Sequence, residues 1–234
     1  MNLYSILLFI AAIIPPIIIM YIVYNVDAER EPLKLILSLF AVGILSGSIT
    51  ILSSYLIQYY FPQLEQLNNQ NLYNLFIYTF LKIGIIEEFS KWFFSFSLCW
   101  KNRAFDQKYD AIVYTVATSL GFAILENVMY VMTGTFKQAF LRGIYSVPGH
   151  AIFAIISGYY IGKAKYDYEK GERTKWKFYK RLSLLLPSIY HTAFDFLLFA
   201  NIDLYTKIFI GFVGFLYING IIKIILAYKD KSVV

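Results

Sequence analysis

Several ionisable side chains lie inside long apolar runs of this sequence, where an isolated charge costs about 2.5–3.5 kcal/mol in a membrane. They fall in four successive runs: Glu87, Glu88 and Lys91 in IIEEFSKWFF, Glu126 in GFAILENVMY, His150 in SVPGHAIFAIISGYYIG, and His191 and Asp195 in SIYHTAFDF. The chain has only two histidines, and both belong to this set. Imidazoles and carboxylates bind zinc, and a carboxylate outside the metal's ligands can take a proton from water. The set therefore indicates hydrolysis, either with a metal ion or with a buried carboxylate that activates water directly.

Helical spacing groups these side chains further. Glu87 and Lys91 are four residues apart and share a helix face, as do His191 and Asp195. We expect Lys91 to neutralise one carboxylate of the glutamate pair. We expect Asp195 to orient the imidazole of His191, which is the usual role of a carboxylate behind a histidine ligand. The spacing leaves open whether Glu87 or Glu88 is the base.

The composition indicates the kind of protein that holds this set. Of 234 residues, 59% are hydrophobic and 15% are charged, whereas soluble domains have about 25% charged residues. We therefore expect one integral-membrane domain over residues 1–234. The net charge of +6 is explained by basic residues flanking membrane helices, so no nucleic-acid partner is expected. A single cysteine, Cys99, excludes an intrachain disulfide.

Apolar segments long enough to cross a bilayer predict an all-α, polytopic bundle of about seven helices. They span about 3–24, 34–60, 73–100, 110–133, 140–165, 182–200 and 204–228. Pro15 and Pro16 are expected to kink the first helix. Gly158 and Gly162 form a small-xxx-small pair that permits close helix contact.

The basic residues predict how the bundle is oriented. With the N-terminus outside and the C-terminus in the cytoplasm, 15 of the 21 Lys and Arg residues lie on the cytoplasmic side. Only Lys137, Arg142 and Lys207 then lie outside. The polar stretch 165–181 is expected to be a cytoplasmic loop, the one substantial soluble loop of the chain.

Two other classes of protein use similar residues. A proton- or ion-coupled transporter also places Glu, His and Asp within the membrane, although this chain is short and shows no repeated halves. A non-enzymatic scaffold could use the same side chains to pack helices. The sequence lacks the HExxH helix of many zinc proteases and the GxSxG turn of serine hydrolases.

Four stretches resemble, in order, the signature regions of the PrsW family of bacterial intramembrane proteases. They are EEFSK (87–91), YDAIVYTVATSLGFAILEN (109–127), SVPGHAIFAIISGYYIGKAK (146–165) and SIYHTAFDF (188–196). The family is itself similar to the superfamily of CAAX prenyl endopeptidases and bacteriocin-processing enzymes. This sequence has Lys91 where that superfamily has Arg, and Glu126 where it has His; both match the PrsW branch.

The resemblance implies an intramembrane protease with a catalytic core at about 85–200. Its substrate would be a single-span regulatory membrane protein of the anti-sigma-factor class. Its location would be the bacterial cytoplasmic membrane, as a multi-pass protein.

Carried onto this chain, the resemblance also assigns residues. Glu87 and Glu88 match the catalytic pair, Lys91 its charge partner, and Asp195 the position that supports the last histidine. The remaining motif positions are matched by Glu126, His150 and His191. These three would bind a metal, expected to be Zn²⁺, or would act as partners of the water and the oxyanion in a metal-free mechanism.

Overall fold

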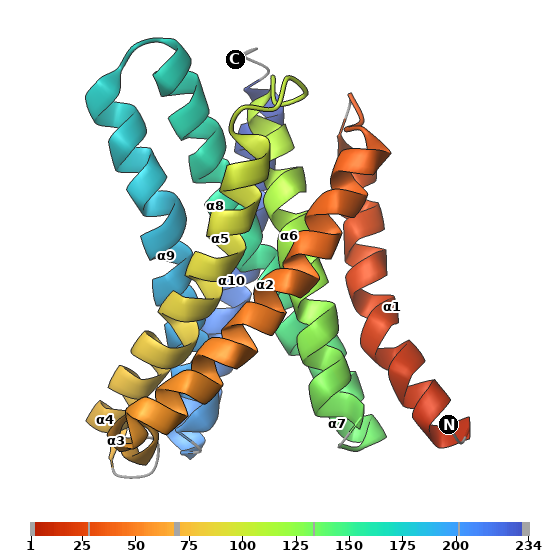
Figure 1. Cartoon of the computed structure of the whole chain (residues 1–234), viewed down its shortest axis with the longest axis vertical. Helices are drawn as coiled ribbons and strands as arrows, with labels where there is room; N and C mark the ends of the chain where they lie inside the picture. Colours follow the sequence, from red (N-terminus) through yellow and green to blue (C-terminus); the bar gives the residue numbers. More distant parts are fainter. Residues whose placement is uncertain (1–2, 28, 68–70, 133, 201, 231–234) are drawn as a thin grey trace.

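The computed structural model describes residues 3–27, 29–67, 71–132, 134–200 and 202–230, and the regular structure of these residues is helical throughout (Figure 1). The long helices are α1 (Leu3–Val26), α2 (Leu33–Tyr60), α5 (Ile85–Cys99), α6 (Lys108–Met132), α8 (Val147–Glu169), α9 (Arg173–Phe199) and α10 (Asp203–Lys229). The short ones are α3 (Pro62–Gln66), α4 (Leu72–Tyr78), α7 (Phe136–Leu141), and the π-helical turns η2 (Thr79–Gly84) and η3 (Arg142–Ser146).

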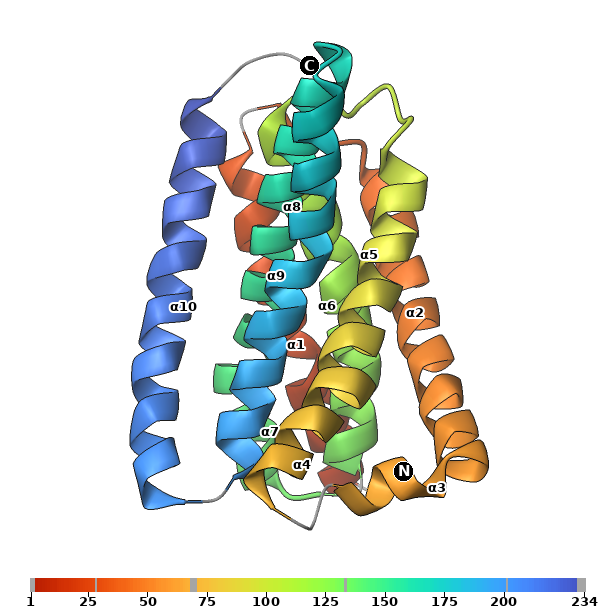
Figure 2. The same ribbon diagram turned by 90° about the vertical axis from the view of Figure 1, so that its left-hand side faces the viewer.

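The helices form one bundle whose two chain termini lie at opposite ends (Figures 1 and 2). Six helices are long and apolar enough to cross a membrane: Leu3–Val26, Leu33–Tyr60, Lys108–Met132, Phe136–Glu169, Arg173–Phe199 and Asp203–Lys229. This confirms the all-α polytopic prediction. The remaining expected segment, 73–100, consists of α4, η2 and α5 in succession and runs from one end of the bundle to the other. The count of seven crossings and the orientation stay predictions, and Thr133, the expected end of one segment, lies outside the described residues.

Helix α6 is the centre of the bundle, and α8 packs closely against it. A Cβ atom at Gly158 would lie 2.4 Å from Thr115 Oγ1, and one at Gly162 would lie 2.6 Å from the Lys108 carbonyl oxygen. The predicted close contact at this glycine pair is therefore confirmed. The hydroxyl of Thr115 also donates a 2.8 Å hydrogen bond to the carbonyl of Ala154 across the two helices.

The polar stretch 165–181 is helical, so the prediction of a long loop is wrong. Helix α8 continues to Glu169 and α9 begins at Arg173. The turn between them contains Gly171, whose positive φ of 74° suits glycine. An i,i+4 pair of Lys165 and Glu169, 2.7 Å apart, belongs to the last turns of α8. Charged residues of good helix propensity extend both helices beyond their apolar segments.

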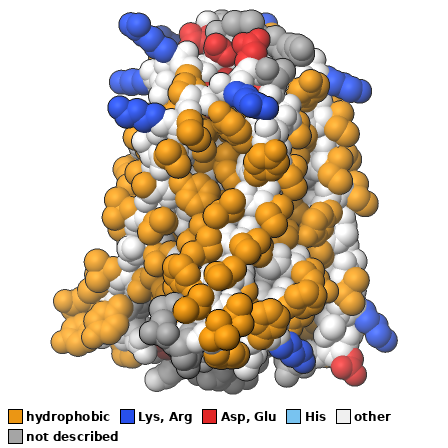
Figure 3. Space-filling view, turned by 90° about the vertical axis from the view of Figure 1, so that its right-hand side faces the viewer, with side chains coloured by type: hydrophobic (Ala, Val, Ile, Leu, Met, Phe, Trp, Pro, Cys, Tyr) orange, Lys and Arg blue, Asp and Glu red, His pale blue; other side chains and the backbone are white. Residues whose placement is uncertain are grey.

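The outer surface is apolar over the middle of the bundle, and Lys and Arg gather mainly toward one end of the face in Figure 3. Many large apolar side chains of α1, α2 and α10 are exposed, including Ile17, Leu37 and Ile210. A surface of this kind is suited to lipid rather than to water. The ionisable set of the four central segments is instead turned inward.

Candidate active site

A close helix crossing places the glutamate pair. The π-helical turn η2 ends at Gly84, immediately before α5. A Cβ atom at Gly84 would lie 2.1 Å from Thr192 Oγ1 and 2.8 Å from the Ser188 carbonyl oxygen. Because glycine removes this overlap, the start of α5 can approach α9. The first turn of α5 therefore brings its carboxylates next to the α9 turn that carries His191.

Of the two glutamates, Glu88 is the one hydrogen-bonded to both Lys91 and His191. Its Oε1 lies 2.6 Å from Lys91 Nζ and 2.8 Å from His191 Nδ1. Glu87 is farther from the lysine, with 3.8 Å between its Oε2 and Nζ. Since an ionised carboxylate only accepts hydrogen bonds, Nδ1 of His191 carries a proton and donates it to Glu88. Glu88 thus fixes the orientation of the His191 imidazole.

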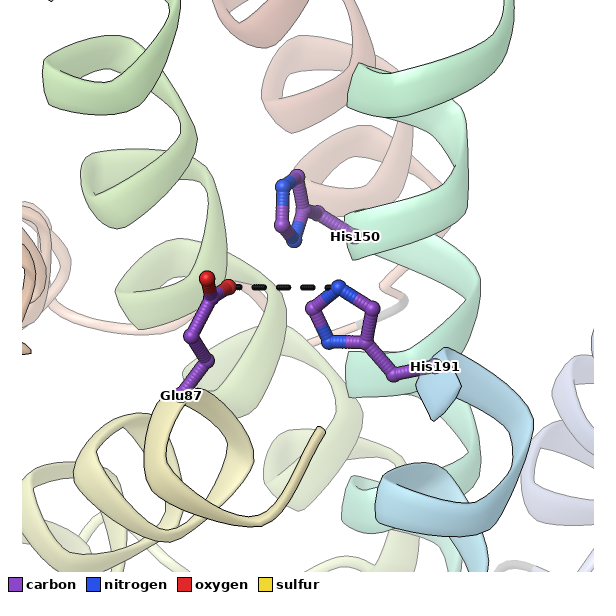
Figure 4. A group of neighbouring side chains, drawn as sticks. All are labelled: Glu87, His150 and His191. Atoms are coloured by element: carbon purple, nitrogen blue, oxygen red, sulfur yellow. Dashed lines mark ion pairs between the residues drawn. The ribbon is translucent and has the colours of Figure 1, made fainter. Parts of the chain in front are cut away.

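The Nε2 side of His191 faces two carboxylates. Its Nε2 lies 3.4 Å from Asp195 Oδ2 and 3.9 Å from Glu87 Oε2. The Glu87 oxygen is buried and accepts no hydrogen bond from the described residues. Figure 4 shows Glu87 pointing from α5 toward the two imidazoles. A buried oxygen left without a donor is rare, and it indicates a place for a ligand or a reacting proton.

His150 is held between a lysine and a carboxylate. Lys91 Nζ lies 3.2 Å from its Nδ1, and Glu126 Oε2 lies 2.7 Å from its Nε2. The lysine can only donate, so Nδ1 accepts and Nε2–H donates to Glu126. Phe122 lies against this group, with its ring 5.6 Å from that of His150 and 4.4 Å from Lys91 Nζ. Phe122 therefore forms an aromatic wall beside His150 and Lys91.

Arg142 is a site residue that the sequence reasoning missed, because its charge was assigned to an external connection. It begins η3, and one guanidinium nitrogen lies 3.0 Å from Glu126 Oε2. Its Nε donates a 2.8 Å hydrogen bond to Asn127 Oδ1. The amide of Asn127 in turn donates to the Ala12 carbonyl, at 3.2 Å. Pro16 lacks the N–H that would otherwise pair with this carbonyl.

Another proline explains why η3 precedes α8. Pro148 has no N–H to offer the carbonyl of Ile144, four residues earlier. The hydroxyl of Tyr217 on α10 donates to that carbonyl at 3.3 Å. Wider π turns of this kind are frequent at functional sites, and here the turn brings Arg142 onto Glu126. The dipeptide Val147–Pro148 before His150 was the available signal in the sequence.

The donor atoms of the site fit a metal ion by type. One ligand atom from each of Glu87, His150 and His191 lies within 4.8 Å of the others. Ligand atoms around tetrahedral zinc are about 3.5 Å apart, so a modest contraction would suffice. His150 would exchange one of its two hydrogen bonds for the ion. The oxygen of Glu87 that accepts no hydrogen bond supports the fit. Glu126, the expected ligand, instead contacts Nε2 of His150.

A cavity of about 800 Å³ opens beside the cluster. Its polar wall includes Glu87, Glu126, Arg142, His150, His191 and Asp195. Its apolar wall includes Tyr145, Phe153, Phe194, Leu198, Phe209 and Ile210. Cavities of this size hold ligands in proteins, and this one extends to residues of α7 and of the beginning of α10.

The predicted site residues are thus brought together from four segments. Glu87, Glu88, Lys91, His150, His191 and Asp195 form one contact network, and Glu126 joins it through His150. The structure decides two details that the spacing left open. Lys91 is closest to Glu88 rather than to its i,i+4 neighbour Glu87. His191 contacts Glu88 through Nδ1 and Asp195 through Nε2.

A helical membrane bundle that encloses a carboxylate–histidine cluster beside a cavity defines a class of membrane-embedded enzymes and transporters. Comparison with known proteins narrows this class. The profile described as PrsW family intramembrane metalloprotease matches residues 31–222. The chain belongs to this family of intramembrane proteases.

Individual relatives agree with this placement. The chain is 35% identical to Protease PrsW of Oceanobacillus iheyensis over 216 residues, covering 92% of this chain and 93% of the relative. It is 34% identical to Protease PrsW of Bacillus subtilis, covering 95% of each chain. It is 34% identical to Protease PrsW of Clostridioides difficile, covering 82% and 79%. No solved structure matches the chain.

Proposed function

We propose that this protein is an endopeptidase of the bacterial cytoplasmic membrane that cleaves a single-span regulatory protein of the anti-sigma-factor class. One observation carries the proposal: Oε2 of Glu87, which accepts no hydrogen bond from the described residues, faces Nε2 of His191 at the cavity wall. A proton acceptor beside a second polar group is the arrangement that water activation requires. The family and its relatives, named proteases, support the reaction type.

A divalent ion, zinc by its donor types, would be held by His150, His191 and Glu87. When bound, such an ion lowers the pKa of a bound water and polarises the carbonyl of the peptide. Metal-free activation of water by the buried carboxylate is the alternative, and removal of metal separates the two.

The protein's own residues have distinct parts in this proposal. Glu87 accepts the proton of the attacking water and returns it to the leaving amine; with an ion bound, the acceptor would be the carboxylate oxygen that is not a ligand. His191, oriented by Glu88, holds its Nε2 toward the reacting groups. His150 is kept in place by Lys91 and Glu126. Burial of the cluster in the bundle strengthens these electrostatic interactions and limits the access of bulk water.

The cavity supports an apolar substrate. The apolar part of the cavity wall includes aromatic and aliphatic side chains of α9 and α10, such as Phe194 and Phe209. These side chains would contact the residues of a membrane span. Because the cavity extends to α7, the scissile bond is expected in the half of the substrate's span nearest the α7 end of the bundle.

The experiment is cleavage in a defined system. The purified protein is reconstituted in liposomes with tagged single-span proteins, and new termini are mapped by mass spectrometry. We expect one main cut in or next to the span. Intact substrates together with proton or ion flux across the liposomes would instead assign the protein to the transporters.

A further inference from the structure

A second group of carboxylates lies away from the active site. It consists of Asp27 and Glu31, in the connection between α1 and α2, and Asp110 in the first turn of α6. All three are buried, with exposed fractions of 5%, 4% and 1%. One carboxylate oxygen from each lies within 4.8 Å of the others.

This acidic group is separate from the active site. Asp110 precedes Glu126 by 16 residues on the same helix, which corresponds to about 24 Å at 1.5 Å per residue. The first turn of α6, which carries Asp110, lies at the end of the bundle where the C-terminus of the chain is marked (Figure 1). None of its members contributes to the cavity beside His191.

Two members of the acidic group have no compensating positive charge among the described residues. Glu31 and Asp110 form no ion pair there, and the charges acting most strongly on Asp110 are those of Glu31 and Asp27. Burial, opposed by the hydrogen bond from Tyr114, raises the pKa of Glu31 to about 7, and the charge of Asp27 adds to this increase. Burying carboxylates without a cation is costly, so Glu31 and Asp110 are suited to a positive ligand.

One oxygen of Asp110 points to such a ligand. Its Oδ2 accepts hydrogen bonds from the backbone N–H groups of Asp106 and Gln107, at 2.9 and 2.6 Å. Its Oδ1 is buried and accepts no hydrogen bond from the described part of the chain. Oδ2 thus fixes the carboxylate at the start of α6, and Oδ1 is left for another partner.

We propose that Asp27, Glu31 and Asp110 bind a hard divalent cation of the Ca²⁺ and Mg²⁺ type. The donor atoms of the three side chains are all carboxylate oxygens, which such ions prefer, whereas the active site contains imidazole nitrogens. The bound cation joins the α1–α2 connection to the first turn of α6. It therefore stabilises the end of the bundle opposite α7 and stands outside the peptidase reaction.

Terbium luminescence tests this site, because Tb³⁺ binds oxygen-rich calcium sites and is excited by nearby tyrosine. Tyr114, whose hydroxyl donates to Glu31, provides the excitation. With the full-length protein in detergent, we expect a saturable signal that Ca²⁺ or Mg²⁺ displaces. The signal should persist in Glu87→Gln and weaken at least about tenfold in affinity in Asp110→Asn. Asp110→Asn retains an oxygen for the two backbone donors.

Two further variants keep the test decisive. Glu31→Gln retains an acceptor for Tyr114 and should also lose the signal, whereas Glu172→Gln, on an exposed side chain, should keep it. Gel filtration reports which variants are folded. The proposal is overturned if wild-type protein gives no saturable signal, in which case protons neutralise the carboxylates. It is equally overturned if the signal survives in folded Asp110→Asn and Glu31→Gln and disappears in Glu87→Gln.

Discussion

His191 donates its Nδ1–H to Glu88, across 2.8 Å between α9 and α5. This hydrogen bond distinguishes the two adjacent glutamates, because only Glu88 forms it. Glu88 is tied to His191 and Lys91, whereas Glu87, about 100° around the helix, presents an unpartnered oxygen to the cavity. The pair is therefore asymmetric, with one carboxylate that positions the histidine and one that is free to react.

The first prediction concerns Glu88→Gln. The amide keeps a carbonyl acceptor for His191 but loses the charge that pairs with Lys91. Because the change affects positioning of the imidazole, we expect kcat to fall about 10–100-fold with little change in KM. Steady-state cleavage of a peptide from the mapped substrate measures both constants. An unchanged kcat with a raised KM would instead place Glu88 in substrate binding.

The second prediction concerns Arg142. Its guanidinium contacts both Asn127 and Glu126, a geometry that the single ammonium of lysine does not reproduce. We expect Arg142→Gln to lower kcat/KM about tenfold or more, since Glu126 then loses its cationic partner, and Arg142→Lys to recover only part of the loss. Lys207→Gln removes an exposed charge of the same sign and serves as the control. Equal activity in all three variants would contradict the role of Arg142.

The third prediction concerns the crossing of α5 and α9. Gly84→Ala would place a methyl group against Thr192 and the backbone of Ser188, so we expect a loss of about 1–3 kcal/mol in stability and a lower Tm. Gly214→Ala in α10 is the matched control, because a Cβ atom there meets nothing within 4 Å. Thermal unfolding in detergent compares the two. A Tm for Gly84→Ala at or above that of Gly214→Ala would refute the close crossing.

The fourth prediction concerns the metal. Chelation should abolish cleavage, and stoichiometric zinc should restore it, because the donor group of Glu87, His150 and His191 fits such an ion. Elemental analysis should find about one zinc per chain, and His191→Ala should lower that content. Full activity of metal-free protein would favour direct activation of water by Glu87.

The sequence was sufficient to predict the helices and the convergence of the ionisable residues within four of the apolar segments. Long apolar segments determine where helices lie, and ionisable residues within them have to converge because lipid does not solvate them. The sequence was not sufficient to predict which carboxylate pairs with Lys91. Both Glu87 and Glu88 lie within one turn of Lys91, so spacing alone could not decide which carboxylate the lysine contacts.

Arg142 and the α8–α9 turn were missed for different reasons. The inward position of Arg142 depends on a π turn before Pro148, and hydropathy gives no information about a local change in helical phase. Helices α8 and α9 continue into a charged stretch. The apolar segments end before this stretch, but the backbone hydrogen bonds of the helices do not. In both cases backbone geometry, rather than composition, decided the outcome.

The role of Glu87 as the proton acceptor is tested most directly by the cleavage rate of Glu87→Gln. The variant is nearly isosteric, so binding of the substrate and folding of the bundle should be retained while the proton acceptor is lost. With purified protein and the mapped single-span substrate, we predict that the cleavage rate of Glu87→Gln is about 10²–10⁴-fold below that of wild type. The control Glu172→Gln should cleave at the wild-type rate. Cleavage by folded Glu87→Gln at the wild-type rate would contradict the role of Glu87 as the proton acceptor.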